Sequence, residues 1–157
     1  MNIILFDDDS RGELLPLTYT RPIADLRIGI LTIREKWDKY LKESSSSLTQ
    51  KYLSEKFKMQ LSNDNLLVNG SILPNQNLVS EIQSLDINEK LVEGNVTIAA
   101  RVDSNNMDGI SLELISRLNV IKKSCNCKFE KLNHIWDIFQ KNGTEIEADF
   151  KLITAGR

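Results

Sequence analysis

The chain has 157 residues, of which 41% are hydrophobic and 27% are charged, and a chain of this length is expected to form one globular domain. Its formal net charge of −2 excludes the clustered positive field with which proteins bind a nucleic-acid backbone. No apolar run approaches the roughly 20 residues that cross a bilayer. Because the start MNIILF runs directly into acids with no basic region before it, we expect no signal peptide and a cytoplasmic location.

In the N-terminal half, short apolar runs alternate with amphipathic segments. Residues 2–7 (NIILFD) form an apolar run closed by acids, typical of a buried first strand in an α/β sheet. Residues 28–41 carry apolar side chains at helical spacing and predict an amphipathic helix. The serine-rich stretch 43–47 predicts an exposed loop, and the apolar spacing over 48–57 predicts a second helix.

The second half continues this alternation. Residues 66–68 predict a buried strand that ends in a tight turn at Asn69-Gly70. Strands alternating with helices favour an α/β layered fold with a mostly parallel sheet, and no repeat of fixed period indicates a solenoid. The other expected elements are a short helix or irregular segment at 77–85, strands at 90–92, 96–102 and 119–124, a loop at 103–109, a helix or loop at 110–118, and two helical pieces within 134–153 separated at Gly143.

The two cysteines and the single histidine limit the metal chemistry that the sequence offers. Cys125 and Cys127 form a Cys-x-Cys pair, which could be half of a metal site, but no second pair of thiols follows it. We therefore expect two ordinary thiols near a strand end and no structural disulfide.

Three segments resemble signatures of the sugar-phosphate nucleotidyltransferases. LLPLTYTRP (14–22) resembles the stretch that follows their glycine-rich loop, LLVNGSIL (66–73) resembles one of their strand ends, and HIWDIFQKN (134–142) resembles one of their helix starts. The segments follow the family's order over nearly the whole chain. The resemblance implies a Rossmann-like nucleotidyltransferase-type layered fold, with residues 1–157 forming one nucleotidyltransferase-like domain.

Within that family, the chain is most similar to a shortened N-terminal portion of the bifunctional N-acetylglucosamine-1-phosphate uridylyltransferases/glucosamine-1-phosphate acetyltransferases. In those proteins a left-handed β-helix follows this domain. The resemblance therefore implies a longer protein with such a C-terminal domain, and a homo-oligomer formed through it.

The chemistry of the family indicates which residues would form a site. A sugar 1-phosphate attacks the α-phosphorus of a nucleoside triphosphate and pyrophosphate leaves, which requires positioning and charge neutralisation. The resemblance implies Arg11 and Arg21 as catalytic cations. It places Ser10, Arg11, Gly12, Asn69, Gly70 and Ser71 at the nucleotide. Asp7, Asp8 and Asp9 offer carboxylates for Mg²⁺, although an acidic triplet after a strand is also typical of a solvated turn with one capping residue.

The chain departs from the family's pattern at three places. Three acids open the loop DDDSRGE (7–13), Ile23 stands where a lysine is expected, and Ser71 stands where an aspartate is expected. Losing one preorganised donor costs about 10² to 10³ in rate. Two hypotheses follow. The domain either forms a sugar nucleotide of the UDP-N-acetylglucosamine type, or it is non-catalytic and binds a sugar nucleotide or acts as a scaffold for an adjoining left-handed β-helix acyltransferase.

Several candidate residues also have a purely structural interpretation. Arg11 and Arg21 lie near acids with which they could pair. Trp37 and Trp136 fall within helical apolar patterns and are expected in the core. His134 opens the last predicted helix and is expected at the surface or as a cap.

Overall fold

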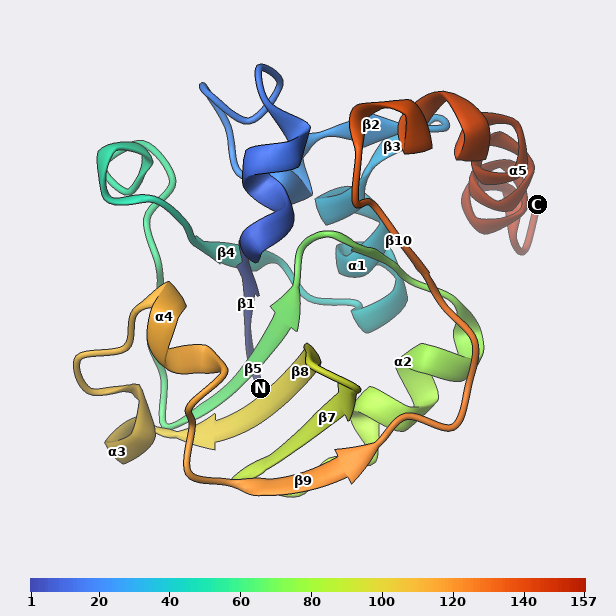
Figure 1. The fold of residues 1–157 in the computed structure, drawn as a ribbon. Helices are drawn as coiled ribbons and strands as arrows, with labels where there is room; N and C mark the ends of the chain where they lie inside the picture. The colour runs from blue at the N-terminus through green and yellow to red at the C-terminus, as the bar shows by residue number, and fades with distance from the viewer.

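A computed structural model describes residues 1–157 and shows a central six-stranded sheet flanked by helices (Figure 1). The strand order is β4-β1-β5-β8-β7-β9. Strand β8 alone runs against the others, because it pairs antiparallel with β5 and β7 while the remaining pairings are parallel. The predicted α/β fold with a mostly parallel sheet is confirmed. The strands are β4 (Ser45–Leu48), β1 (Asn2–Phe6), β5 (Asp64–Asn69), β8 (Val96–Asp103), β7 (Glu89–Glu93) and β9 (Ile121–Ser124).

Helices and two small two-stranded sheets complete the architecture. No helix combines the length and the apolar composition that a membrane span requires. The small sheets pair β2 (Arg27–Ile28) with β3 (Leu31–Thr32), and β6 (Ile72–Leu73) with β10 (Glu130–Lys131). The α-helices are α1 (Ile33–Leu41), α2 (Gln76–Gln83), α3 (Ser104–Met107), α4 (Leu112–Ile115) and α5 (Ile135–Thr154), and the 3₁₀ helices are η1 (Asp9–Leu14), η2 (Ile23–Asp25) and η3 (Lys51–Leu53).

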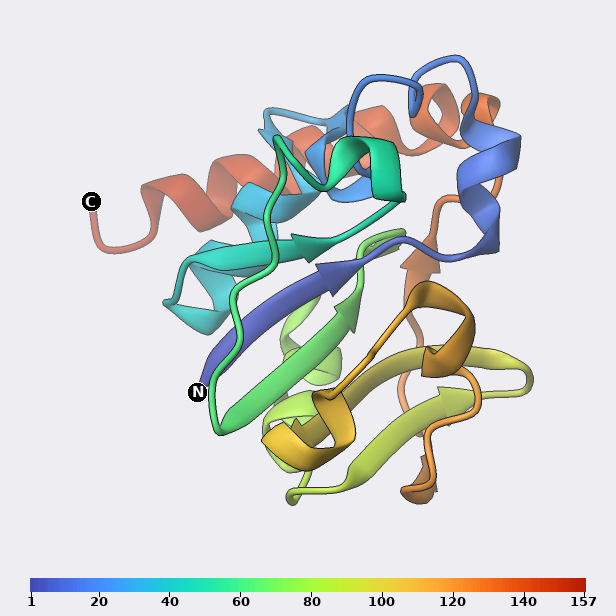
Figure 2. The ribbon, with the colours of Figure 1, turned by 90° about the vertical axis from the view of Figure 1, so that its left-hand side faces the viewer.

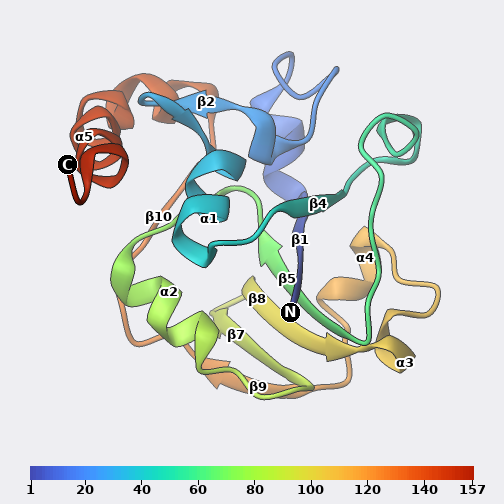
Figure 3. The same cartoon turned by 180° about the vertical axis from the view of Figure 1, so that it is seen from behind.

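The two faces of the sheet are covered by different helices. Helices α1 and α2 lie on one face, which Figure 3 brings to the front, and α3 and α4 lie on the other. Side chains of β1 alternate between the two apolar clusters: Ile3 and Leu5 belong to the larger, and Ile4 and Phe6 to the smaller. Because successive strand residues point to opposite faces, β1 is buried on both sides, as its apolar run predicts.

The prediction of an exposed loop at 43–47 is wrong. Ser45–Leu48 forms the edge strand β4, paired in parallel with β1. The guanidinium of Arg34 donates to the Ser45 carbonyl over 3.2 Å and to the Ser45 hydroxyl over 3.0 Å. Backbone pairing with a buried strand and this arginine outweigh the weak strand preference of serine.

The helix predicted over 28–41 begins only at Ile33. The preceding residues form the β2–β3 hairpin, whose turn holds Gly29 at a φ of 74°. Thr32 then caps the helix, because its hydroxyl accepts from the Glu35 N–H over 3.1 Å while the Glu35 carboxylate accepts from the Thr32 N–H over 2.7 Å. Such a capping box sets a helix start more sharply than apolar spacing does.

The predicted helix over 48–57 is reduced to the single 3₁₀ turn η3. Leu48 is the last residue of β4, and Tyr52 is 59% exposed, so Leu53 is the main apolar anchor of this segment. The prediction of a loop at 103–109 is wrong, because the short helix α3 lies within it. Helix α4 lies within 110–118, where a helix was one of the two expectations. The strands β5, β7, β8 and β9 and the helix α2 are confirmed.

The prediction of two helical pieces separated at Gly143 is also wrong, because α5 is continuous. A Cβ built at Gly143 would meet no atom within 4 Å, and a glycine in a helix costs about 1 kcal/mol relative to alanine. Buried Asp149 anchors the helix: its carboxylate lies 2.5 Å from the buried Lys36 ammonium and accepts from the Ile30 N–H over 2.9 Å. Helix α5 therefore runs along α1 and the β2–β3 hairpin (Figure 2).

The two tryptophans have different environments. Trp37 is fully buried and donates to the Ile72 carbonyl over 2.9 Å, as its place in the core predicts. The prediction that Trp136 lies in the core is wrong, because it is 57% exposed on the outer side of α5. Helical spacing identifies a common face but does not reveal whether another element covers it.

Candidate functional site

A cleft of about 790 Å³ lies where β1 and β5 end. Open α/β sheets bind ligands at the carboxyl ends of their strands, and small-molecule sites have volumes of about 300 to 1,000 Å³. Asn95 of the β7–β8 turn and Thr97 of β8 contribute to the lining, as does Glu113 of α4. The segment before α5 contributes Lys131 and His134. The cleft thus has the size and position of a ligand site.

Asp8 is the most highly connected carboxylate of this cleft. It caps η1 by accepting from the Ser10 N–H over 3.0 Å. It also accepts from the Asn69 amide over 3.0 Å and from the Ser71 hydroxyl over 3.1 Å, and it lies 3.0 Å from the Lys131 ammonium. Burial by itself raises the pKa of Asp8, but the hydrogen bond from Ser10, the charge of Lys131 and the amide of Asn69 outweigh it, so the pKa is lowered from 3.8. Asp8 is therefore a stable anion near neutral pH.

Lys131 provides a positive charge at this point. It lies on β10, where it pairs with Ile72 of β6, and only 14% of its side chain is exposed. Its ammonium also lies 2.5 Å from the Ser10 hydroxyl and 3.0 Å from the Asn133 amide oxygen. Sequence reasoning missed Lys131. It lies three residues before the segment that resembles a family helix start, but no local pattern indicates that β10 carries it to Asp8.

The three acids of the triplet do not form a common set of metal ligands. The Asp7 carboxylate points into the protein, where it accepts from the Ile23 N–H over 2.9 Å and from the Thr49 hydroxyl over 2.5 Å. Burial raises the pKa of Asp7 above 3.8. Asp9 is exposed and makes no side-chain hydrogen bond, while Asp8 is held by Lys131. Asp7, Asp8 and Asp9 therefore do not fit a site for a resident magnesium ion.

Arg11 and Arg21 are not among the residues that line the cleft. The Arg11 guanidinium donates to the Thr18 carbonyl over 3.2 Å and to the Tyr52 hydroxyl, and it lies 5.5 Å from the centre of the Tyr52 ring. Arg21 is exposed and its side chain makes no hydrogen bond or ion pair. Neither arginine pairs with an acid. Gly12 is exposed as well and lies outside the cleft lining.

The turn after β5 holds the Asp8 carboxylate by hydrogen bonds from Asn69 and Ser71. Asn69 lines the cleft, and its amide oxygen accepts from the Ser71 hydroxyl over 2.7 Å. Gly70 donates to the Phe6 carbonyl over 2.8 Å, and a Cβ there would lie 3.2 Å from that carbonyl oxygen. Of the predicted nucleotide-binding residues, the structure brings Ser10 and Asn69 to the cleft lining, while Gly70 and Ser71 lie outside it.

Most of the charged side chains that line the cleft are acidic. His134 precedes α5, stacks on the Trp136 ring at a centroid distance of 4.3 Å, and has its Nδ1 3.6 Å from the Glu13 carboxylate. Sequence reasoning missed Asn95 and Thr97, although the Gly94-Asn95 pair between two predicted strands is a hairpin signal. The charged lining consists of the acids Asp7, Asp8, Asp9, Glu13 and Glu113 and the bases Arg117 and Lys131.

Comparisons with known proteins give the fold and the family. A search of curated proteins finds no match. A putative glucose-1-phosphate thymidylyltransferase from Bacillus anthracis, solved in complex with a sucrose, is similar with a TM-score of 0.56 and 9% identity, over 94% of this chain and 96% of that one. A CTP:phosphocholine cytidylyltransferase from Streptococcus pneumoniae is matched with a TM-score of 0.48 and 12% identity, over 91% of this chain and 98% of that one. The family model described as "Sugar nucleotidyl transferase" matches residues 3–157. Because that match spans nearly the whole sequence, the chain belongs to the sugar nucleotidyl transferase family.

Proposed function

We propose that the cleft binds a nucleoside triphosphate and a sugar 1-phosphate and joins them into a sugar nucleotide. The observation that carries this proposal is the ammonium of Lys131, held 3.0 Å from Asp8 in a cleft at the ends of β1 and β5. In the reaction, a phosphate oxygen of the sugar 1-phosphate bonds to the α-phosphorus, and the bond from that phosphorus to the bridging oxygen breaks. Pyrophosphate leaves with the bonding electrons.

Charge neutralisation is the main demand of such a transfer. Ile23 replaces the lysine that the family pattern predicts, so the chain needs a cation from elsewhere. Lys131 and Arg117 are the bases in the cleft lining. Lys131 is oriented by Asp8 and Asn133, which supports a contact with a phosphate oxygen at little cost in side-chain entropy.

The resemblance to the uridylyltransferases supports UTP and N-acetylglucosamine 1-phosphate as the substrates, with a UDP-N-acetylglucosamine type of product. Magnesium enters this proposal as the counter-ion of the triphosphate, and no step depends on a magnesium ion held by the protein. The same resemblance assigns Arg11 and Arg21 to the triphosphate. In our proposal Arg11 reaches a phosphate only by leaving Tyr52, so Lys131 makes the primary contact.

Titration calorimetry of the 157-residue chain with magnesium UTP tests the proposal. We expect Lys131→Ala to weaken UTP binding by about tenfold or more, the scale of a hydrogen bond to a charged group. Lys151→Ala removes an exposed lysine of α5 that makes no hydrogen bond, and it should bind UTP as the original chain does. CTP and dTTP, titrated in parallel, report the base preference.

Pyrophosphate release with N-acetylglucosamine 1-phosphate measures turnover directly. Binding of UTP without release would support the non-catalytic hypothesis. If neither UTP binding nor pyrophosphate release occurs at millimolar UTP and sugar phosphate, the enzymatic function is excluded for this chain. Arg11→Ala tests the assignment made by resemblance. If UTP affinity falls strongly in Arg11→Ala and not in Lys131→Ala, Arg11 makes the primary contact with the triphosphate.

A second candidate function is a scaffold that packs against an adjoining β-helix acyltransferase domain. The observation that favours it is a row of exposed apolar side chains on α5, with Trp136 57%, Phe139 77% and Phe150 61% exposed. Their spacing places them along one side of the helix, and apolar rows of this kind are typical of interaction surfaces.

The scaffold is tested in the longer protein that the resemblance implies. Phe139→Ser combined with Phe150→Ser should disturb its assembly, measured by light scattering, while leaving UTP binding unchanged. Normal assembly of this variant, and of a protein lacking residues 1–157, would exclude the scaffold.

A further inference from the structure

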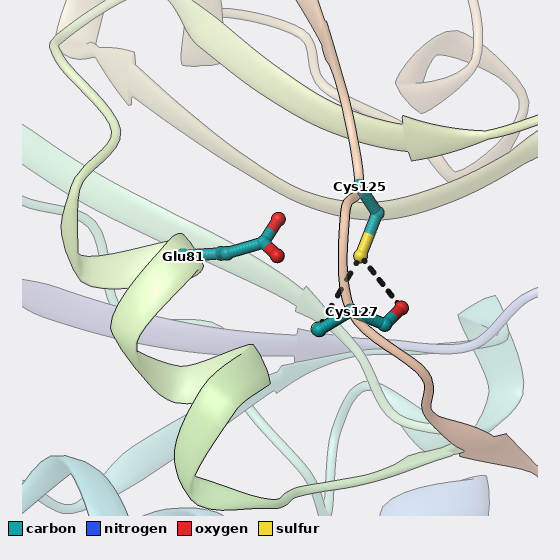
Figure 4. Close-up of side chains that lie close together, drawn as sticks. All are labelled: Glu81, Cys125 and Cys127. Atoms are coloured by element: carbon teal, nitrogen blue, oxygen red, sulfur yellow. Dashed lines mark hydrogen bonds between the residues drawn. The ribbon is translucent and has the colours of Figure 1, made fainter.

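Three potential metal ligands from distant parts of the sequence meet beside α2, away from the cleft. Glu81 extends from α2 toward the segment that follows β9, where Cys125 and Cys127 lie (Figure 4). The two Sγ atoms are 3.6 Å apart, and these atoms and a Glu81 carboxylate oxygen all lie within 4.8 Å of one another. It is the only group of three such residues in the structure whose ligand atoms come this close.

The fold holds this arrangement in place without any ion. Cys125 follows directly after β9, and its N–H donates to the Val92 carbonyl of β7 over 2.9 Å. The N–H of Asn126, between the two cysteines, donates to both carboxylate oxygens of Glu81, over 3.2 Å and 3.1 Å. Both thiols pack against the larger apolar cluster, and both are free. The sheet therefore positions the first sulfur, and Asn126 orients the carboxylate toward the pair.

The distances correspond to a tetrahedral metal site. Zinc–sulfur bonds of about 2.3 Å in a tetrahedron place two sulfurs about 3.8 Å apart, close to the 3.6 Å between Cys125 and Cys127. A disulfide requires about 2.05 Å, so these thiols would have to move much further to oxidise than to chelate. A thiolate pair with one carboxylate selects zinc over magnesium or calcium, which prefer oxygen ligands alone.

We propose that Glu81, Cys125 and Cys127 bind one zinc ion, with water as the fourth ligand. The spacing of cysteine and histidine in the sequence does not reveal this site, because the third ligand is a glutamate more than forty residues earlier, brought there by the packing of α2. The Asn126 N–H would orient the Glu81 carboxylate as a ligand through its hydrogen bonds.

Zinc at this place would tie α2 to the segment that leads to β10. That segment is also attached to α2 at its start, because the Asn75 amide donates to the Lys128 carbonyl over 3.0 Å. Lys131 follows a few residues later on β10. The ion would therefore limit the movement of the segment just before β10, which places this lysine beside Asp8. The zinc site does not depend on the proposed reaction.

Zinc titration of the metal-free 157-residue chain tests the inference. We expect one zinc per chain, a higher melting temperature, since an ion that binds only the folded form stabilises it, and protection of both thiols from alkylation. Cobalt, used as a spectroscopic substitute, should give a thiolate-to-metal charge-transfer absorption. Each readout is independent of enzymatic activity.

Variants identify the ligands. Cys125→Ser and Cys127→Ser should each abolish the cobalt absorption and weaken zinc binding at least a hundredfold, and Glu81→Gln, which keeps both thiols, should weaken it about tenfold or more, as the loss of a ligand or its support does. Glu147→Gln, an exposed glutamate of α5, is the matched control. Circular dichroism verifies that each variant is folded.

Two outcomes would overturn the inference. One is zinc binding of equal strength in the folded Cys125→Ser and Cys127→Ser variants, which would show that the ion binds elsewhere on the chain. The other is no thermal shift and no thiol protection at a zinc concentration well above that of the protein.

Discussion

Lys131 and Asp8 form an ion pair of 3.0 Å between a strand near the end of the chain and the first loop after β1. The pair has two effects on the cleft. It neutralises one of the acids that would repel a triphosphate, and it holds an ammonium at the carboxyl end of the sheet, where ligands of α/β folds bind.

Lys131 holds Asp8 in its charged form, so its loss should change how Asp8 titrates. Its pKa is lowered from 3.8, with Lys131 among the causes that oppose burial. A lowered pKa stabilises the fold above the unfolded value of 3.8, and this contribution is lost as pH falls through the folded pKa. We expect Lys131→Met to raise the pKa of Asp8, so that acid unfolding begins at a higher pH. Carboxyl-carbon NMR measures the titration directly. An Asp8 pKa that is the same in Lys131→Met as in the original chain would contradict the role given to this pair.

Asp7 should show the opposite pH dependence. Burial raises its pKa above 3.8. Its contribution to the unfolding free energy is therefore greatest below pH 3.8 and is lost as pH rises through the folded pKa. Asparagine can accept from the Ile23 N–H and donate to the Thr49 hydroxyl. We therefore expect the unfolding free energy of Asp7→Asn to increase relative to the original chain as pH rises from 3.8. Urea unfolding at several pH values measures the difference, and Asp9→Asn controls for loss of a charge.

The buried ion pair of Lys36 should be costly to break. Its ammonium lies 2.5 Å from Asp149 and 2.7 Å from Glu145, and only 2% of its side chain is exposed. Lys36→Met leaves two carboxylates without a partner, and we expect a loss of about 3 to 5 kcal/mol in unfolding free energy. Lys39→Met, an exposed lysine of the same helix, should change stability by about 0.5 kcal/mol or less. Similar losses in both variants would show that helix propensity, rather than the buried pair, determines the effect.

Two glycines should respond in opposite ways to alanine. Gly143 lies in α5, where an added Cβ would meet no atom within 4 Å, so Gly143→Ala should stabilise by about 0.5 to 1 kcal/mol. Gly29 has a φ of 74°, and a Cβ there would lie 2.7 Å from an Asp149 carboxylate oxygen, so Gly29→Ala should destabilise. Thermal melting compares the two variants, and a stabilising Gly29→Ala would contradict the close packing of α5 on the β2–β3 hairpin.

The sequence by itself determined the buried strands and the family. The apolar runs at the start of the chain and before Asn69 identify β1 and β5, because a strand buried on both faces requires continuous apolar side chains. The three segments that resemble the nucleotidyltransferases indicate the family that the match over residues 3–157 shows. These signals are local, so a single sequence carries them.

The tertiary structure decided what these elements bring together. Serines form β4 because β1 offers an unpaired edge, and α5 continues through Gly143 because Asp149 binds Lys36. Lys131 reaches Asp8 through the pairing of β10 with β6, and Glu81 reaches the cysteines through the packing of α2. Each of these contacts joins residues far apart in the chain. Local propensity and periodicity do not encode such contacts, which depend on the order of strands in the sheet and on the packing of helices upon it.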